Sequence, residues 1–241
     1  MLVVVPTPIG NLQDITLRAL EALREADLVA AEDTRHSGLL LHHHGIKKPM
    51  VSLHEHNESS RAEGLLEEIA QGKNVALITD AGMPGISDPG FRLIRACRER
   101  GLPMTVLPGP SAMLTGLAGS GLPMDSFHFG GFLPVKSGRR RTELERAIAR
   151  EHTSVYFESP YRLLKSLEVL QEIAPTAAVC VARELTKKFE EYRRGKPEEL
   201  ARHYLAHPPK GEITLVISPQ DAARLAPASD DEPEDSEHDA A

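Results

Sequence analysis

Residues 79–90 combine reactive side chains with an unusual backbone composition: Thr-Asp-Ala-Gly-Met-Pro-Gly-Ile-Ser-Asp-Pro-Gly. The glycines let the backbone approach a ligand closely, and the prolines stiffen the loop so that its N–H groups keep one direction. An apolar run at residues 75–78 precedes this loop, so we expect a buried strand that ends at a ligand-binding site. The simpler alternative is a tight connection in which Ser87 or Asp88 caps the next helix.

Side chains that can accept a proton follow several predicted strands. They are Asp14, Glu32, Asp33, His54, Glu55 and Asp80. The carboxyl ends of these strands are the usual place for a site in an α/β sheet, and one of these groups can act there as a general base. Asp14 has an alternative role, because an acidic residue just before Ile-Thr-Leu can help to cap a helix. The histidines at 42–44, 54 and 56 are not expected to hold a metal, since adjacent helical histidines point to different faces and no spaced third ligand is visible.

The net charge of −7 arises at the C-terminus. Acidic residues are frequent after residue 229 and basic residues are absent there, so the rest of the chain carries 28 acidic and 28 basic residues. We therefore expect a neutral folded part at residues 1–218 and an acidic disordered tail at residues 219–241.

Two groups of basic residues can bind phosphate groups, such as those of a nucleic acid. The first comprises Lys136, Arg139, Arg140 and Arg141, and the second comprises Lys187, Lys188, Arg193, Arg194 and Lys196. The usual alternative for such a group is a solvated helix face. Arg35 can likewise contact a phosphate, or it can pair with Glu32 or Asp33. Because the chain lacks Trp and only 4% of its residues are aromatic, we do not expect a broad stacking platform for single-stranded RNA.

Strands alternate with helices through residues 1–120, which predicts a mainly parallel sheet covered on both faces. The pattern changes near residue 120, and residues 121–218 predict a second, smaller α/β domain. Two such domains leave a cleft between them, which is a common place for a ligand. No apolar run approaches the length of a membrane span and no signal peptide is recognisable, so we expect a cytoplasmic protein. Cys97 and Cys180 are isolated, which favours core positions.

The order of these loops resembles the tetrapyrrole-methylase superfamily of S-adenosylmethionine-dependent methyltransferases, the class III methyltransferases, over residues 1–218. The resemblance rests on residues 6–16, 31–35, 52–57, 79–90, 108–112, 129–132, 157–160 and 182–187. Met83 stands where the superfamily usually has an aspartate. The Glu-Asp-Thr-Arg segment at residues 32–35 resembles the members that act on ribosomal RNA, and it differs from those that act on porphyrins and corrins.

This resemblance implies an enzyme that methylates the ribose 2′-hydroxyl of a cytidine in the decoding region of bacterial 16S rRNA, within the small ribosomal subunit. It implies two α/β domains with a ligand cleft between them, S-adenosylmethionine as the cofactor, no metal, and a homodimer. The alternatives are a methyltransferase for a tetrapyrrole or other small molecule, and a non-catalytic RNA- or nucleotide-binding module. Related rRNA enzymes often continue into a small helical module, and here the acidic tail stands instead, which is the best support for the binding module.

The resemblance also implies which residues bind the cofactor. They are Pro8, Asp80, Gly82, Met83, Pro84, Gly85, Ile86, Ser87, Ser111, Ala112, Phe157, Glu184, Glu212 and Ile213. A ribose hydroxyl is a poor nucleophile, so for catalysis we favour a general base among Asp14, Glu32 and Asp33. Positioning without a dedicated base is the alternative. For RNA binding we favour Arg35, Lys136, Arg139, Arg140 and Arg141.

Overall fold

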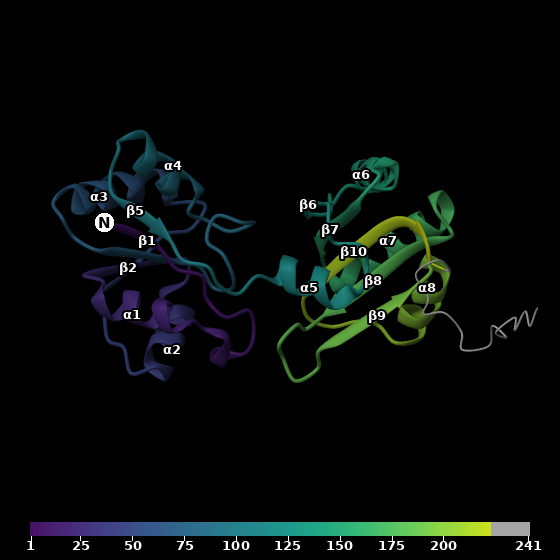
Figure 1. Cartoon of the computed structure of the whole chain (residues 1–241), viewed down its shortest axis with the longest axis horizontal. Coiled ribbons are helices and arrows are strands. Elements are labelled where there is room, and N and C mark those ends of the chain that lie inside the picture. The colour runs from purple at the N-terminus through teal and green to yellow at the C-terminus, as the bar shows by residue number, and fades with distance from the viewer. Residues whose placement is uncertain (223–241) are drawn as a thin grey trace, which may run out of the picture.

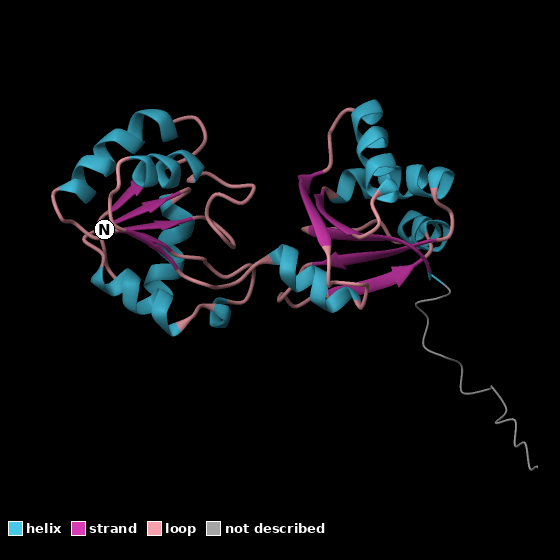
Figure 2. Cartoon of the chain, turned by 45° about the horizontal axis from the view of Figure 1, so that its top comes forward, coloured by secondary structure: helices cyan, strands magenta, loops and turns pink. Residues whose placement is uncertain are grey.

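The computed structural model describes residues 1–222, which form two five-stranded sheets, each covered by its own helices (Figures 1 and 2). This arrangement confirms the predicted α/β class. Within the described residues, no helix has both the length and the apolar character that a membrane crossing requires.

The first sheet is parallel throughout and has the strand order β3-β2-β4-β1-β5. Its strands are β1 (Leu2–Val4), β2 (Leu28–Ala31), β3 (Met50–Ser52), β4 (Val75–Ile78) and β5 (Met104–Val106). Between them lie the 3-10 helix η1 (Leu12–Asp14) and the helices α1 (Leu17–Glu25), α2 (Thr34–His43), α3 (Glu58–Ala70) and α4 (Phe91–Glu99). Because all strands run in one direction, the loops that follow them meet at one edge of the sheet.

Strand β4 lies at the centre of the first sheet and is buried on both faces. Successive side chains of a strand point to opposite faces. Accordingly, Val75 and Leu77 belong to the core under α3 and α4, whereas Ala76 and Ile78 belong to the core under α1 and α2. The continuous apolar run therefore specifies a fully covered parallel strand, and the loop at residues 79–90 starts from a rigid base.

The second sheet is mixed and has the order β6-β7-β10-β8-β9. Its strands are β6 (Phe127–Phe132), β7 (Thr153–Glu158), β8 (Ala177–Arg183), β9 (Glu191–Gly195) and β10 (Ile213–Asp221), and its helices are α5 (Ala112–Ser120), α6 (Ser137–Ala149), α7 (Pro160–Ile173) and α8 (Pro197–Ala206). Only β6 and β7 pair in parallel; the other pairs are antiparallel.

Side chains of β10 alternate between two apolar cores. Leu215 and Ile217 join the core built with α6, α7 and α8, whereas Val216 joins the core beneath α5. Cys180 lies in the second of these cores, and Cys97 lies in the core under α3 and α4. Both cysteines are buried and free, which confirms that they are core residues.

Helix α5 packs on the second sheet, although the predicted boundary at residue 120 assigns it to the first domain. In Figure 1 it lies between the two sheets and borders the second. Strand β10 runs through Asp221, so the first residues of the predicted tail are part of the sheet; the remainder of that tail, residues 223–241, lies outside the described residues. Helix α2 begins at Thr34, directly after Asp33, which caps it.

Candidate functional site

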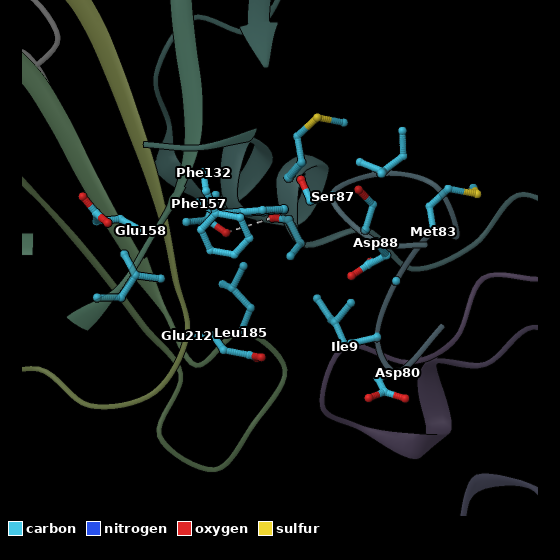
Figure 3. Close-up of a pocket in the computed structure, with 18 of the residues that line it drawn as sticks. Ile9, Asp80, Met83, Ser87, Asp88, Phe132, Phe157, Glu158, Leu185 and Glu212 are labelled. Atoms are coloured by element: carbon cyan, nitrogen blue, oxygen red, sulfur yellow. Dashed lines mark hydrogen bonds between the residues drawn. The ribbon is translucent and has the colours of Figure 1, made fainter. Parts of the chain in front are cut away.

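A pocket of about 410 Å³ lies where the loops of the first sheet face the second sheet. Its first wall consists of Ile9, Glu32, residues 80–83, residues 86–88 and residues 111–113. Its second wall consists of Phe132, residues 157–160, Leu185 and residues 211–214. Figure 3 shows the two walls facing each other, with Asp80, Met83, Ser87 and Asp88 on one side and Phe132, Phe157 and Glu212 on the other. The volume is within the range of small-molecule sites, which is roughly 300–1,000 Å³.

Backbone hydrogen bonds fix the loop after β4 to the loop after β1. Gly82 has a φ of 85°, which residues with a side chain rarely adopt. It exchanges two backbone hydrogen bonds of 3.0 Å with Thr7, which follows β1. The Thr7 hydroxyl also donates to the Thr79 carbonyl oxygen at 2.9 Å. The loops after β1 and β4 are therefore fixed to each other, and the glycine permits this close pairing.

The far end of the same loop is held by Glu58, a buried carboxylate at the start of α3. It accepts the Gly90 N–H at 3.1 Å and the Arg92 N–H at 2.8 Å. These donors belong to the first turn of α4, where helical N–H groups have no partner within the helix. Sequence reasoning missed this residue because a lone glutamate in an exposed-looking stretch carries no signal of such a contact.

We expect Glu58→Ala to lower the free energy of unfolding by about 1–3 kcal/mol, because it leaves buried N–H donors without an acceptor. The measurement is urea unfolding followed by circular dichroism. Glu67→Ala on the exposed face of the same helix is the control, with an expected change within about 0.5 kcal/mol. Equal changes for the two variants would show that the Glu58 contacts carry no special stabilisation.

The second wall presents aromatic and aliphatic side chains. Phe157 packs edge-on against Phe132, with ring centroids 5.4 Å apart, and against Phe129, with centroids 5.2 Å apart. Leu185 and Ile9 are buried together where the two walls meet. Such surfaces enclose the apolar parts of a ligand, including an aromatic ring.

Behind the second wall, hydrogen bonds among Glu184, Lys187 and Glu212 connect the loops before β10 and after β8; we call this group the brace. The Glu184 carboxylate accepts the Glu212 N–H at 3.1 Å and the Lys187 ammonium at 3.0 Å. Lys187 also donates to Glu212 at 2.7 Å. Gly211 has a φ of 83°, and a Cβ there would overlap the Glu184 carboxylate. The brace also meets the first sheet, because the Asn11 N–H donates to the Thr186 hydroxyl at 3.0 Å.

The first wall carries a group of carboxyl side chains at the ends of β2 and β4. Glu32 accepts the Thr79 hydroxyl at 2.6 Å, and Asp80 accepts the Asp33 N–H at 3.3 Å. Burial raises the pKa of Asp80, and the neighbouring Glu32 charge adds to this. Among the described residues, no Lys, Arg or His side chain lines the pocket. The site therefore has negative potential and suits a ligand that carries positive charge.

Of the predicted catalytic residues, Glu32 lines the pocket, whereas Asp14 and Asp33 do not. Asp33 instead caps α2 by accepting the Arg35 N–H at 2.8 Å. Hydrogen bonds from Arg35 lower the pKa of Asp33 to about 2, so its carboxylate is a weak base. Asp14 is exposed in η1, while Thr16 caps α1. Helix capping in this segment is therefore carried out by Asn11 and Thr16, and not by Asp14.

Most of the predicted cofactor residues lie together in the pocket. Those in its walls are Asp80, Gly82, Met83, Ile86, Ser87, Ser111, Ala112, Phe157, Glu212 and Ile213, and those outside are Pro8, Pro84, Gly85 and Glu184. Sequence reasoning did not name Phe132, Leu185 or Asp88 as site residues. Two signals were nevertheless present, since Phe132 ends the Phe-Gly-Gly-Phe segment and Asp88 belongs to the same loop as Asp80.

The first basic group is only partly exposed at the start of α6. Lys136 and Arg139 are exposed, whereas Arg140 is buried and donates to the Val135 carbonyl oxygen at 3.2 Å. Arg141 pairs with Glu145 at 3.2 Å and with Glu172 at 2.7 Å. The interpretation of Arg140 as an RNA-binding residue is therefore wrong, because its guanidinium faces the protein. The structure keeps Arg35 exposed and paired with Asp33 at 3.0 Å.

Comparison with known proteins gives a family match, two similar relatives and one similar structure. The family model for tetrapyrrole (corrin/porphyrin) methylases matches residues 1–201. A Haemophilus influenzae protein named ribosomal RNA small subunit methyltransferase I is 49% identical over 90% of this chain and 78% of its own length. A Thermotoga maritima protein of the same name is 47% identical over 90% of this chain and 97% of its own. A crystal structure of diphthine synthase, 17% identical, covers 93% of this chain and 92% of its own with a TM-score of 0.72, and this likeness concerns the fold alone.

Proposed function

The chain belongs to the tetrapyrrole methylase family, and within it to the ribosomal RNA small subunit methyltransferase I proteins, and from this membership we propose that it methylates 16S rRNA. The proposed reaction transfers a methyl group from S-adenosylmethionine to the ribose 2′-hydroxyl of a cytidine in the decoding region. A cytoplasmic location and a homodimer belong to the same proposal.

The observation that carries the proposal is the pocket between the two sheets and the chemistry of its walls. S-adenosylmethionine combines an adenine ring, a positively charged sulfonium and an amino acid group. The aromatic wall with Phe157 suits adenine, and the carboxyl groups of Glu32 and Asp80 suit positive charge. Backbone groups of the Gly82–Ser87 loop can hold the amino acid group. The residues present therefore fit this cofactor.

When bound, the cofactor supplies a methyl group that is activated by the positive charge on sulfur. The protein residues then have two tasks, which are to align the ribose oxygen with that methyl group and to exclude water. We assign cofactor contacts to Asp80, Gly82, Met83, Ile86, Ser87, Ser111, Ala112, Phe157, Glu212 and Ile213. Pro8, Pro84, Gly85 and Glu184 do not line the pocket, and Glu184 holds the Glu212 N–H from behind the second wall.

The test is methyl transfer from labelled cofactor by the purified protein. Small ribosomal subunits without the modification, naked 16S rRNA and a tetrapyrrole precursor serve as parallel substrates, and digestion of the RNA to nucleosides identifies the product. We expect labelled 2′-O-methylcytidine from the subunit or the rRNA. Transfer to the tetrapyrrole alone would replace the proposal with a small-molecule methyltransferase, and cofactor binding without any transfer would replace it with a binding module.

The lengths of the relatives bear on the binding-module alternative. Its main support is the expectation that rRNA enzymes of this kind continue into a helical module. The Thermotoga maritima protein extends little beyond the residues that match this chain, since the match covers 97% of it. A protein can therefore carry the name of this methyltransferase without much additional length, which weakens that support.

We expect the double variant Lys136→Ala/Arg139→Ala to weaken rRNA binding. The slope of the logarithm of the binding constant against the logarithm of the salt concentration should become less steep by about 1.4, which is the value for two lost phosphate contacts to single-stranded RNA. Both side chains are exposed just after the pocket residue Phe132. Filter binding at several salt concentrations measures the slope. Lys165→Ala on the exposed face of α7 is the control. An unchanged slope in the double variant would remove these cations from the RNA interface.

A further inference from the structure

Asp88 lies in the first wall of the pocket and was not among the predicted bases. It follows Ser87, whose φ of 64° is uncommon for a residue with a side chain. It precedes Pro89 and Gly90, and Glu58 holds the Gly90 N–H. The position of Asp88 is therefore set by an unusual backbone conformation on one side and by a buried carboxylate contact on the other. Such strained positions are concentrated at functional sites.

Acidic groups from three different segments face Asp88. Glu32 follows β2, Asp80 follows β4, and Glu212 precedes β10 on the opposite wall. Burial is the largest influence on Asp88, and the nearby charges of Glu32 and Asp80 act in the same direction. Together they raise the pKa of Asp88 to about 7. Asp88 therefore gains and loses a proton near neutral pH, as an efficient general base should.

The hydroxyl of Thr79 connects Asp88 with Glu32. Thr79 is in contact with the Asp88 carboxyl, and it donates its single proton to Glu32 at 2.6 Å. The Thr79 contact favours the charged form of Asp88, but burial and the charges of Glu32, Asp80 and Glu212 outweigh it. The pKa of Asp88 is therefore raised in spite of this contact.

The other carboxyl groups of the first wall are less suited to accept a proton. Glu32 already accepts the Thr79 hydroxyl and, at 3.4 Å, the Asp80 N–H. Asp80 accepts the Asp33 N–H at 3.3 Å. Asp88 has no such N–H donor among the hydrogen bonds described for residues 1–222.

We propose that Asp88 is a catalytic residue that accepts the proton of the ribose 2′-hydroxyl during methyl transfer. This inference rests on the function proposed above. As the ribose oxygen bonds to the methyl carbon, the carbon–sulfur bond breaks and its electron pair stays on sulfur. The hydroxyl proton moves to the Asp88 carboxylate. The positive charge on sulfur and the negative charge on Asp88 disappear together, so total charge is conserved.

The charge of the bound cofactor strengthens this role. A cation within about 4–6 Å favours the charged form of a carboxyl group and lowers its pKa by roughly 1–3 units. A sulfonium held at that distance would keep Asp88 ionised before transfer. Once the methyl group has left, the sulfur is neutral, and the surrounding Glu32, Asp80 and Glu212 again favour a protonated Asp88. The affinity of Asp88 for a proton thus rises during methyl transfer, which is when the ribose hydroxyl gives up its proton.

Calorimetry tests this coupling without measuring activity. S-adenosylmethionine and S-adenosylhomocysteine share the amino acid group and adenine, and differ in the charge on sulfur. We expect binding of S-adenosylmethionine at pH 7 to release more protons, and its affinity to rise about tenfold more between pH 6 and 8 than that of S-adenosylhomocysteine. In Asp88→Asn this difference should vanish while the affinity for S-adenosylhomocysteine is retained, which also shows that the variant is folded.

Single-turnover transfer to small ribosomal subunits is the second measurement. We expect Asp88→Asn to slow transfer at least about 100-fold, while Asp125→Asn, an exposed residue before β6, transfers at the wild-type rate. Near wild-type transfer by Asp88→Asn, or a proton release that persists in it, would overturn the assignment. Loss of both ligands would also overturn it, because Asp88 would then be a binding or structural residue. Absence of transfer by the wild-type protein would instead contradict the proposed function, and the calorimetric difference would still test Asp88.

Discussion

Gly82→Val should weaken S-adenosylmethionine binding about 30-fold. Gly82 has a φ of 85° and lines the pocket, and its backbone pairs with Thr7. A β-branched residue is strained by about 1–3 kcal/mol in this conformation. The free variant can relieve this strain by adopting another backbone conformation in the loop after β4. Cofactor binding then has to restore the strained conformation, and this costs binding free energy. A cost of about 2 kcal/mol corresponds to the expected loss, since about 1.4 kcal/mol is tenfold in affinity.

Gly72→Val is the matched control for this prediction. Gly72 has a φ of 93° in the turn between α3 and β4, and its surroundings leave open space for a Cβ. Both variants should therefore lose stability through the same backbone strain, measured by thermal unfolding. Isothermal titration should show weaker cofactor binding for Gly82→Val alone. If both variants bind the cofactor like the wild type, the loop after β4 does not form the cofactor site.

Arg162→Met should lower the free energy of unfolding by about 3 kcal/mol. Arg162 donates to Glu158 at 2.9 Å, and the Glu158 side chain has an exposure of 0%. Glu158 also accepts the Ser166 hydroxyl at 2.7 Å. Removal of the arginine leaves the carboxylate buried without its cation, and the remaining hydrogen bonds replace only part of the lost interaction with water. Urea unfolding measures the change.

Arg202→Met tests whether burial causes this effect. Arg202 pairs with Glu198 at 2.7 Å and is likewise four residues from its partner, but the two side chains are 71% and 59% exposed. Water screens such a pair, so the expected change is less than about 1 kcal/mol. Similar losses in the two variants would mean that the removed arginine side chain, rather than the buried charge, determines the stability change.

The fold was largely predictable because local patterns and burial agree in this chain. The apolar run at Val75–Ile78 predicted a buried strand, and β4 is buried on both faces of a parallel sheet. The segment around Ile-Thr-Leu was expected to lie at a helix start, and the Thr16 hydroxyl accepts the Ala19 N–H at 3.1 Å at the start of α1. The start of α2 was not predicted, although Asp33 caps it by accepting the Arg35 N–H.

The candidate site was predictable where its residues share one segment. The composition of residues 79–90 identified the loop that forms much of the first wall. The burial of Arg140 was not predictable, because a run of basic residues does not show which member of the run faces the core. Asp88 was considered only as a helix cap, since its acidic neighbours Glu32 and Glu212 lie far away in the sequence.

The sequence by itself determined the α/β class, the family and the loops that approach the cofactor, because these depend on residue types and on spacing along the chain. The tertiary structure alone decided which carboxyl groups share one pocket. It also decided which of them pair with a cation or cap a helix instead. Proton affinity depends on burial and on charges a few ångströms away, and folding brings those charges together from distant segments. Asp33 and Asp88 illustrate this. Hydrogen bonds from Arg35 lower the pKa of Asp33 to about 2, whereas burial and nearby acidic groups raise the pKa of Asp88 to about 7.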